Sequence, residues 1–257
     1  MDGFENQRAG PVSGSFAGGY WPGMDDSKVA VGRRGGVGQW VRFRALLLVN
    51  LALFALFLLG VLLTGHAHEN EDLTDHDQPT QTLLQYAGSS SFGETVFENW
   101  ESEFLQMGMY VLLTTFLVQK GSAESRPIDE DAPQDEDPRN HRNDPEAPWP
   151  VRRGSELVLR LYENSLAIAF GLVFALSIWL HAVTGARAYS QDQQLHGGQA
   201  VTTWQYVHTS QFWFESFQNW QSEFLAVAAI IGGSVYLRQR SSTQSKPVHA
   251  PNSQTGD

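Results

Sequence analysis

The chain has 257 residues, of which 42% are hydrophobic, and it carries a formal net charge of −11 at pH 7. It contains no cysteine, which excludes disulfides, thiol nucleophiles and thiolate metal sites. The acidic balance argues against a nucleic-acid partner, and the collection of the hydrophobic residues into blocks argues against an ordinary soluble domain.

Residues 1–40 are rich in glycine and have no apolar period, so we expect a disordered cytoplasmic tail. The first apolar block, residues 45–63, would be about 28 Å long as a helix, which matches the hydrocarbon core of a bilayer. Arg33 and Arg34 precede it, as in a signal peptide, but the block exceeds the ~7–15 apolar residues of such a segment. We therefore predict a transmembrane helix here.

An acidic segment without lysine or arginine follows at residues 66–92, and we predict that it is an external loop. Its side chains are of types that bind zinc or a similar ion, but only Asp72 and His76 recur at a matching later position, as Asp192 and His196. We interpret the segment as solvated and predict no metal site, with metal binding as the alternative. The residues concerned are His66, His68, Glu69, Asp72, His76 and Asp77.

The second helix is predicted to begin near Ser91, because Ser91 and Glu94 have the spacing of a capping box. An acidic, proline-rich stretch, residues 122–156, is interpreted as a solvated cytoplasmic linker. A second external loop is expected at residues 186–211. The remaining apolar runs are residues 104–118, 166–183 and 224–237, and residues 241–257 are expected to be a disordered tail.

The runs at residues 104–118 and 224–237 are short for a membrane span. They cross a bilayer only if Trp100 and Trp220 lie at one interface and the basic residues after each run lie at the other. The alternative is that these two runs are buried or re-entrant helices.

One unit occurs twice in the chain. Residues 97–105 return almost unchanged as residues 217–225, and the offset of 120 positions continues without a gap on both sides. We therefore predict an all-α membrane protein with four transmembrane helices. They form two tandem, parallel hairpins, residues 41–121 and 157–240, with disordered termini and a disordered central linker.

Basic residues predict the orientation of the hairpins. Of the 17 lysines and arginines, 16 lie before the first apolar run, between the second and third, or after the fourth, and Arg187 is the exception. The positive-inside rule then places both termini and the linker in the cytoplasm.

The paired motifs at residues 98–105 and 218–225, with Pro-Trp-Pro-Val-Arg-Arg at residues 148–153, resemble a family of bacterial multi-pass membrane proteins catalogued as a domain of unknown function. The resemblance covers residues 40–250. It implies a bacterial plasma-membrane protein, and it brings no substrate, cofactor or catalytic residue with it.

Polar residues at the start of the two short apolar runs form the candidate site. Glu103 and Glu223 lie about one turn inside the tryptophan ring, where an ionised carboxylate is costly unless it faces a polar interior. In a functional interpretation they face each other and bind a cation or exchange a proton. In a structural one, this group joins helices by hydrogen bonds. His181, in the third helix, is predicted to be hydrogen-bonded or snorkelling, not a metal ligand. The candidate residues are Asn99, Trp100, Ser102, Glu103, Asn219, Trp220, Ser222 and Glu223.

We favour a structural or accessory protein of the plasma membrane, with a small transporter or an ion or proton pathway through the paired carboxylates as the alternative. No phosphate loop, nucleophile elbow or zinc-protease motif is present, so neither an enzyme nor a cofactor is predicted. The expected partners are the lipid bilayer and a homo-oligomer or membrane partner. Small residues on the fourth helix, Ala228, Gly232 and Gly233, would make that contact.

Overall fold

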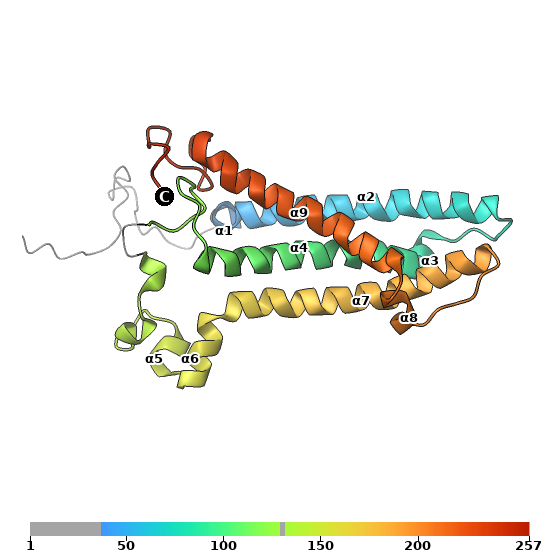
Figure 1. Ribbon diagram of the computed structural model, residues 1–257, viewed down its shortest axis with the longest axis horizontal. Coiled ribbons are helices and arrows are strands. Elements are labelled where there is room, and N and C mark those ends of the chain that lie inside the picture. Colours follow the sequence, from blue (N-terminus) through green and yellow to red (C-terminus); the bar gives the residue numbers. More distant parts are fainter. Residues whose placement is uncertain (1–36, 129–131, 257) are drawn as a thin grey trace, which may run out of the picture. The chain divides into compact units, whose positions relative to one another are not determined.

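The computed structural model of the protein describes residues 37–128 and 132–256, and every regular element in these ranges is helical (Figure 1). The predicted all-α class is therefore confirmed. The tail predicted for residues 1–40 lies outside the described residues up to position 36, while positions 37–40 belong to helix α1 (Val37–Phe43). The chain divides into two compact units, one ending at Phe57 and one beginning at Leu58.

The first unit contains α1 and the first part of α2 (Ala45–Asp75). Asn50 is the one strongly polar residue between positions 45 and 57, and its amide donates to the carbonyl of Leu46 at 2.8 Å. A polar side chain that is satisfied within its own helix can enter hydrocarbon at a lower cost.

The two longest helices, α2 and α7 (Ser165–Leu195), extend well past the apolar blocks from which they were predicted. The external loops predicted at residues 66–92 and 186–211 are in fact helical as far as Asp75 and Leu195. Hydropathy marks where a helix leaves hydrocarbon, whereas the alanine, glutamate and glutamine residues beyond that point continue a helix readily. Both helices are long and apolar enough to cross a membrane.

The second unit contains helices in two matching sets. The members of each pair, α2 with α7, α3 with α8 and α4 with α9, have bounds that differ by 120 residues at both ends, the offset found in the sequence. The further elements in chain order are α3 (Leu83–Ala87), α4 (Ser90–Phe116), the 3₁₀ helices η2 (Pro133–Asp135) and η3 (Pro138–His141), α5 (Trp149–Arg153), α6 (Glu156–Glu163), α8 (Thr203–Val207) and α9 (Ser210–Tyr236).

Matching caps begin the helices of the two sets. Thr82 and Thr202 each form a capping box with the glutamine three residues further on, at the starts of α3 and α8. Ser89 and Thr209 cap α4 and α9. The predicted capping box at Ser91 is wrong, because Ser89 already accepts the hydrogen bond that starts α4 and leaves position 91 inside the helix.

Helix α4 lies at the centre of the second unit, packed along α7 and, over a shorter length, against α9 (Figure 1). Two glycines allow it to approach α7 closely. A Cβ at Gly93 would lie 2.8 Å from Thr184, and one at Gly108 would lie 3.2 Å from Phe170. Small residues at such positions are what close helix contact in a membrane requires.

Of the α9 residues predicted to contact another chain, Ala228 and Gly232 are exposed and Gly233 is half-buried in the described chain. A Cβ at Gly232 would meet nothing within 4 Å, and one at Gly233 would meet only a leucine of the same segment. Within the chain, α4 has long helices on two sides, so close approach between helices occurs on α4 and not at these positions of α9. A contact of α9 with another chain stays a prediction.

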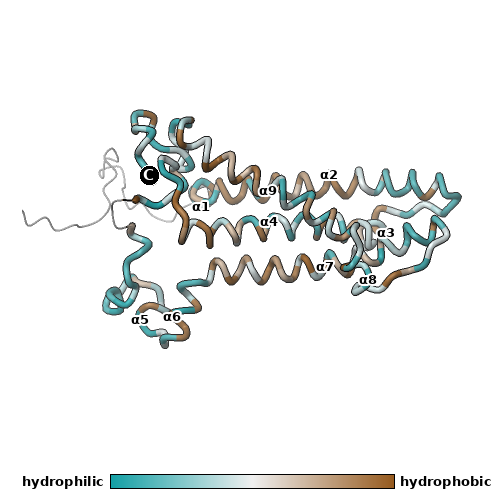
Figure 2. The backbone as a smooth tube through the Cα atoms, in the orientation of Figure 1, coloured by the Kyte–Doolittle hydropathy of each residue, from teal (hydrophilic) through white to brown (hydrophobic). Residues whose placement is uncertain are grey.

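Hydropathy varies along the helices (Figure 2). The middle of α7 is hydrophobic, and its end nearest α8 is hydrophilic. Large apolar side chains such as Leu172 and Trp179 on α7, and Leu225 and Ile230 on α9, are exposed. An apolar surface of this extent is unusual for a protein in water, and lipid can cover it.

The tail predicted to be disordered at residues 241–257 is folded over its described part, up to position 256. Lys246 is only 1% exposed, and its ammonium nitrogen lies 2.5–3.2 Å from the oxygens of four backbone carbonyls, one of them that of Gly121, which share its three hydrogens. The N–H of Gly256 donates to the carbonyl of Ser122 at 2.9 Å. A polar composition predicts disorder only when the backbone groups lack partners, and here a buried cation supplies them.

Candidate functional site

His181 of α7 is the centre of a buried polar network. Its side chain has no exposed surface, its Nδ1 lies 3.0 Å from Oε2 of Glu101 on α4, and its Nε2 lies 3.3 Å from Oε2 of Glu215 on α9. A carboxylate oxygen can only accept a hydrogen bond, so with both carboxylates ionised the imidazole must carry two protons. With a neutral imidazole, a carboxyl group must hold a proton instead. Either way, the three side chains hold one proton more than a neutral imidazole with two ionised carboxylates would.

Glu101 is buried as completely as His181. Its Oε1 accepts a hydrogen bond from the hydroxyl group of Ser216 on α9 at 2.7 Å, while its Oε2 faces the imidazole. A buried carboxylate needs such partners, because removing it from water costs several kcal/mol. Glu101 therefore joins α4, α7 and α9 through hydrogen bonds.

Tyr206 of α8 connects this network to a further carboxyl group. Its hydroxyl lies 3.1 Å from Oε1 of Glu94 and also contacts Oε2 of Glu215. A phenol has one hydrogen, so it can donate to only one of two carboxylates at a time. The second contact requires a protonated carboxyl group, or a cation between the two acids. Burial, together with the hydrogen bond to Glu215, raises the pKa of Tyr206 above its usual range, so the phenol keeps its hydrogen.

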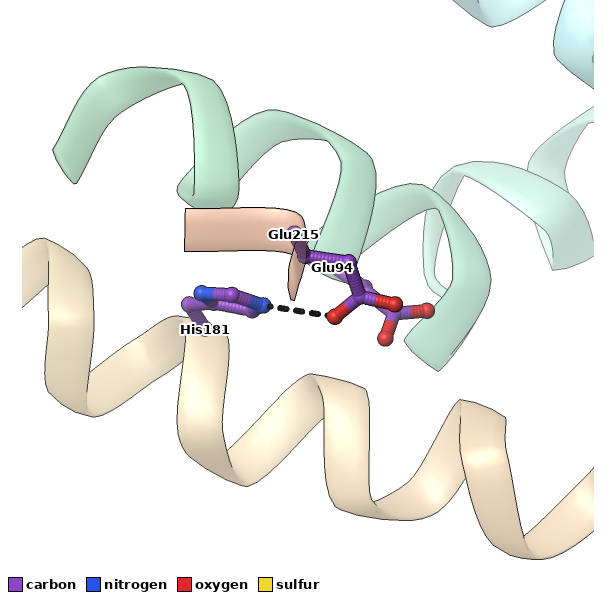
Figure 3. A group of neighbouring side chains, drawn as sticks. All are labelled: Glu94, His181 and Glu215. Atoms are coloured by element: carbon purple, nitrogen blue, oxygen red, sulfur yellow. Dashed lines mark hydrogen bonds and ion pairs between the residues drawn. The ribbon is translucent and has the colours of Figure 1, made fainter. Parts of the chain in front are cut away.

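Glu94, His181 and Glu215 converge from three helices, with the imidazole of His181 directed at the carboxylate of Glu215 (Figure 3). One ligand atom from each of the three residues lies within 4.8 Å of the others. An imidazole nitrogen with carboxylate oxygens is a donor set that suits zinc and other divalent transition metals. The same groups also suit a shared proton. The residues joined by these contacts, called the His181 network below, are Glu94, Glu101, His181, Tyr206, Glu215 and Ser216.

A polar cavity of ≈ 790 Å³ leads to the His181 network. Glu94 and Glu215 form part of its wall, together with Glu69 and Asp72 from α2 and Asp192 from α7. Among the described residues that line it there are these five carboxylates and no lysine or arginine. Such a cavity carries a negative potential, which raises the local concentration of cations.

Small and aromatic residues shape the space around His181. A Cβ at Gly185 would lie 2.6 Å from the ring of Tyr206 and 2.8 Å from the carboxylate of Glu94, so only glycine leaves room for both. Phe212 stacks on His181 with ring centres 4.9 Å apart, and it belongs to a buried apolar cluster with Tyr206. The imidazole thus has an apolar face and a polar edge, which favours its hydrogen bonds over contact with water.

The candidate residues predicted on α4 turn out to occupy a different face from Glu101. Asn99 and Glu103 are exposed, and Trp100 is half-buried. Ser102 is buried, but its hydroxyl donates within the helix, to the carbonyl of Asn99 at 2.7 Å. Glu103 follows Glu101 by two positions, which turns it about 200° around the helix.

The predicted residues on α9 have similar surroundings. Asn219, Trp220 and Glu223 are half-buried, and Ser222 is exposed, with its hydroxyl donating to the carbonyl of Asn219 at 2.8 Å. The structure separates Glu103 and Glu223 from the His181 network, because neither is among the carboxylates that contact His181.

Most of the His181 network was missed because it does not follow the internal repeat. His181 has Val61 as its counterpart 120 positions earlier, and Glu101 has Gln221 as its counterpart. The sequence comparison selected residues that agree between the two copies. The sequence does contain a signal for the network, but it lies at positions where the two copies differ: ionisable side chains within long helices. The prediction that His181 is hydrogen-bonded is confirmed.

These features define an all-α protein with two helices long and apolar enough to cross a membrane and with a carboxylate and histidine network buried between its helices. The chain belongs to the family described as Domain of unknown function (DUF6766), whose model matches residues 37–257. The resemblance to a domain of unknown function is thereby confirmed. No curated protein and no solved structure matches the chain.

Proposed function

We propose that the protein is a multi-pass membrane protein that conducts or transports a cation, either a proton or a metal ion, and is not an enzyme. The cation enters through the polar cavity and is held by Glu94, His181 and Glu215. In the transport interpretation of the sequence, Glu103 and Glu223 bind the cation; we assign that role to Glu94, His181 and Glu215 instead.

One observation carries the proposal: the single hydroxyl of Tyr206 contacts two carboxyl groups, Glu94 and Glu215, at the wall of the cavity. Two acids placed in this way need a shared positive charge between them, because like charges in a partly buried site disfavour full ionisation. Glu215 also contacts His181, so the charge can pass between the cavity and a buried imidazole.

Four transmembrane helices in two parallel hairpins suit this function. α2 and α7 are long and apolar enough by themselves, and α4 and α9 carry exposed apolar side chains, among them Leu112, Phe116, Leu225 and Ile230, that lipid would cover. The family resemblance implies a bacterial plasma membrane, and the bias of the basic residues supports both termini in the cytoplasm, so the cavity opens to the outside.

A second cavity supplies the other end of a route. It has a volume of ≈ 280 Å³, and Gln106, Tyr110 and Glu124 are among the residues that line it. Tyr110 donates to Oε2 of Glu124 at 2.7 Å, and Oε1 of Glu124 is buried without a hydrogen-bond partner in the described part of the chain. From Glu94 to Tyr110, α4 rises about 24 Å, which is most of the ~30 Å hydrocarbon core. The two cavities give a cation one place to enter and one place to leave.

The accessory role favoured by the sequence is the second candidate, and one observation favours it. His181, Glu101 and Ser216 satisfy one another's hydrogen bonds, as a lock between α4, α7 and α9 would. In that case the network holds the helices together and carries nothing across the membrane.

Ion flux into vesicles containing the purified full chain separates the two candidates. We expect uptake of protons or divalent cations, followed with dyes inside the vesicles, and we expect Glu94→Gln and Glu215→Gln to slow it by about 10–100-fold. Glutamine keeps the shape of the side chain but cannot exchange a charge. Glu103→Gln is the matched control, since Glu103 is exposed on the same helix as Glu94, and we expect little change from it.

Helix content and thermal stability are measured for each variant, so that loss of flux is not confused with loss of the fold. No flux above that of empty vesicles would show that the transport proposal is wrong and would favour the accessory role. Undiminished flux in both glutamine variants would show that Glu94 and Glu215 do not hold the cation.

A further inference from the structure

His76 and His196 form a second group, at the rim of the polar cavity. His76 directly follows α2, and His196 directly follows α7, at positions 120 residues apart. Their ring centres lie 5.3 Å apart in an edge-to-face arrangement. Asp72 and Asp192, one turn earlier on each helix, line the cavity, so the two histidines stand where the cavity meets its surroundings.

The hydrogen bonds of both rings define which nitrogen carries the hydrogen. In each histidine, Nδ1 lies 2.9 Å from the backbone carbonyl oxygen four residues earlier, at Asp72 or Asp192. A carbonyl oxygen only accepts, so Nδ1 is the protonated nitrogen, and in a neutral ring Nε2 has a free lone pair. Metal-binding histidines are oriented in this way, with the second ring nitrogen donating to a carbonyl or a carboxylate.

The spacing of the rings fits a shared metal ion. Two imidazoles on one tetrahedral ion, with metal to nitrogen distances of about 2.0–2.1 Å, have ring centres about 5 Å apart. The observed separation of 5.3 Å therefore needs little adjustment. The carboxylates of Asp72 and Asp192 lie 3.7 and 3.4 Å from the Nδ1 atoms of their histidines, so they add negative charge beside the rings, and water would complete the coordination of an ion held by the Nε2 atoms.

The charge around the pair also favours a cation. Asp75 and Asp77 flank His76, and residues 66–92 contain no lysine or arginine that would compete for these carboxylates. Two protonated imidazoles at this separation would repel each other, whereas two neutral rings holding one divalent ion would not. The surroundings thus supply negative charge, and the rings supply the neutral nitrogen ligands.

We propose that His76 and His196 together bind one divalent transition-metal ion of the zinc class through their Nε2 atoms, at the rim of the polar cavity. Paired imidazoles select such ions over Mg²⁺ and Ca²⁺, which take oxygen ligands. The binding itself is independent of the proposed function. The role of this pair as a loading site for Glu94, His181 and Glu215 rests on that function.

The test is titration of Zn²⁺ into the purified full chain in detergent by calorimetry, with the visible absorbance of Co²⁺ reporting the donor set. The titration is run in the wild type and in Glu215→Gln, where the deeper group is impaired. We expect His76→Ala and His196→Ala each to weaken the rim site by about 10–100-fold, and the double variant to add little. An excess of Mg²⁺ should not compete.

His208→Ala is the matched control. The Nδ1 of His208 lies 2.7 Å from the backbone carbonyl of Trp204, which defines the same tautomer, but its ring packs against the indole of Trp204. We expect this variant to bind Zn²⁺ as the wild type does.

Unchanged Zn²⁺ affinity in His76→Ala or His196→Ala, in a chain whose helix content is retained, would overturn the proposal, as would an equal loss in His208→Ala. If a variant fails to fold, His76→Asn and His196→Asn take its place, and retained affinity there has the same meaning. Zn²⁺ binding at His76 and His196 without flux of any cation would support the rim site and contradict the proposed transport function. Failure of one proposal can therefore be told apart from failure of the other.

Discussion

Position 61 on α2 and position 181 on α7 are equivalent in the two sets of helices, yet Val61 is 37% exposed and His181 is fully buried. The acidic partner differs in the same way, because Glu101 is buried and its counterpart Gln221 is exposed. The surrounding frame is shared. A tyrosine on the short helix of each set packs against a glycine on the long helix, Tyr86 on Gly65 and Tyr206 on Gly185.

This comparison separates the features that both sets of helices need for folding from those that form the His181 network. The caps, the helix lengths and the contact between glycine and tyrosine occur in both sets, so they are what the fold requires. His181 and its acidic partners are not repeated 120 positions away, so the fold does not require them. The site combines His181 and Glu215 of the second half with Glu94 and Glu101 of the first, and the matching position in the other half supplies the control for each residue.

The largest effect is expected from His181→Val, which copies Val61. It leaves Glu101 and Glu215 without their imidazole partner and should cost about 3–5 kcal/mol in the free energy of unfolding. The triple change His181→Val, Glu101→Gln and Glu215→Thr copies the other half at all three positions and should recover most of that loss, because the penalty belongs to the unpaired charges. Reversible unfolding in mixed micelles measures both. A triple variant as unstable as the single one would show that the surrounding helices do not tolerate the three counterpart residues at these positions.

A smaller effect is expected from Gly185→Ala, about 3 kcal/mol, at the upper end of the usual range for overpacking. The added Cβ would meet both the ring of Tyr206 and the carboxylate of Glu94 at under 3 Å. In Gly65→Ala the added Cβ would lie closer still to the hydroxyl oxygen of Tyr86, but only the outer end of that one side chain has to move, so its destabilisation should be smaller. Thermal unfolding of the two variants side by side provides the measurement, and equal losses would contradict the difference inferred between the halves.

The segments after α4 and α9 give the third comparison. Lys246 is buried among four carbonyls, whereas its counterpart Arg126 forms a partly exposed ion pair with Asp135 at 2.7 Å. Lys246→Met should cost about 2 kcal/mol, because buried carbonyls lose a charged donor, and Arg126→Met should cost less than about 1 kcal/mol. Hydrogen exchange and limited proteolysis of residues 241–256 report the release of this segment. Protection that survives Lys246→Met would show that the lysine does not hold it.

The smallest effect is expected from the caps, and here the halves should behave alike. Thr82→Ala and Thr202→Ala each remove a capping-box hydroxyl and should cost about 1 kcal/mol. Chemical unfolding of both variants tests the equality. A clear difference between them would mean that α8, which carries Tyr206, depends on its cap more than α3 does.

The sequence by itself determined the helical class, the offset of 120 residues between matching helices, and the two longest apolar segments. These features are local, because hydropathy and periodicity depend on residues that are close together in the sequence. Helix ends were less well predicted, because α2 and α7 continue past their apolar blocks into polar residues that are good helix formers. The C-terminal segment was also misjudged, because Lys246 finds its carbonyl partners only when distant parts of the chain meet.

Only the tertiary structure decided which face of α4 turns inward. Glu101 and Glu103 are two residues apart, and choosing between them requires knowing where α7 and α9 lie. In a soluble protein the apolar face of a helix marks the core, but a helix that contacts both lipid and other helices is apolar on either side, so this signal is lost. The buried group of Glu101, His181 and Glu215 comes from three helices, and its members are brought together by packing over long sequence distances. That is why the chain alone indicated a membrane protein with carboxylates near its helix ends, while the fold alone identified the carboxylates that meet a histidine.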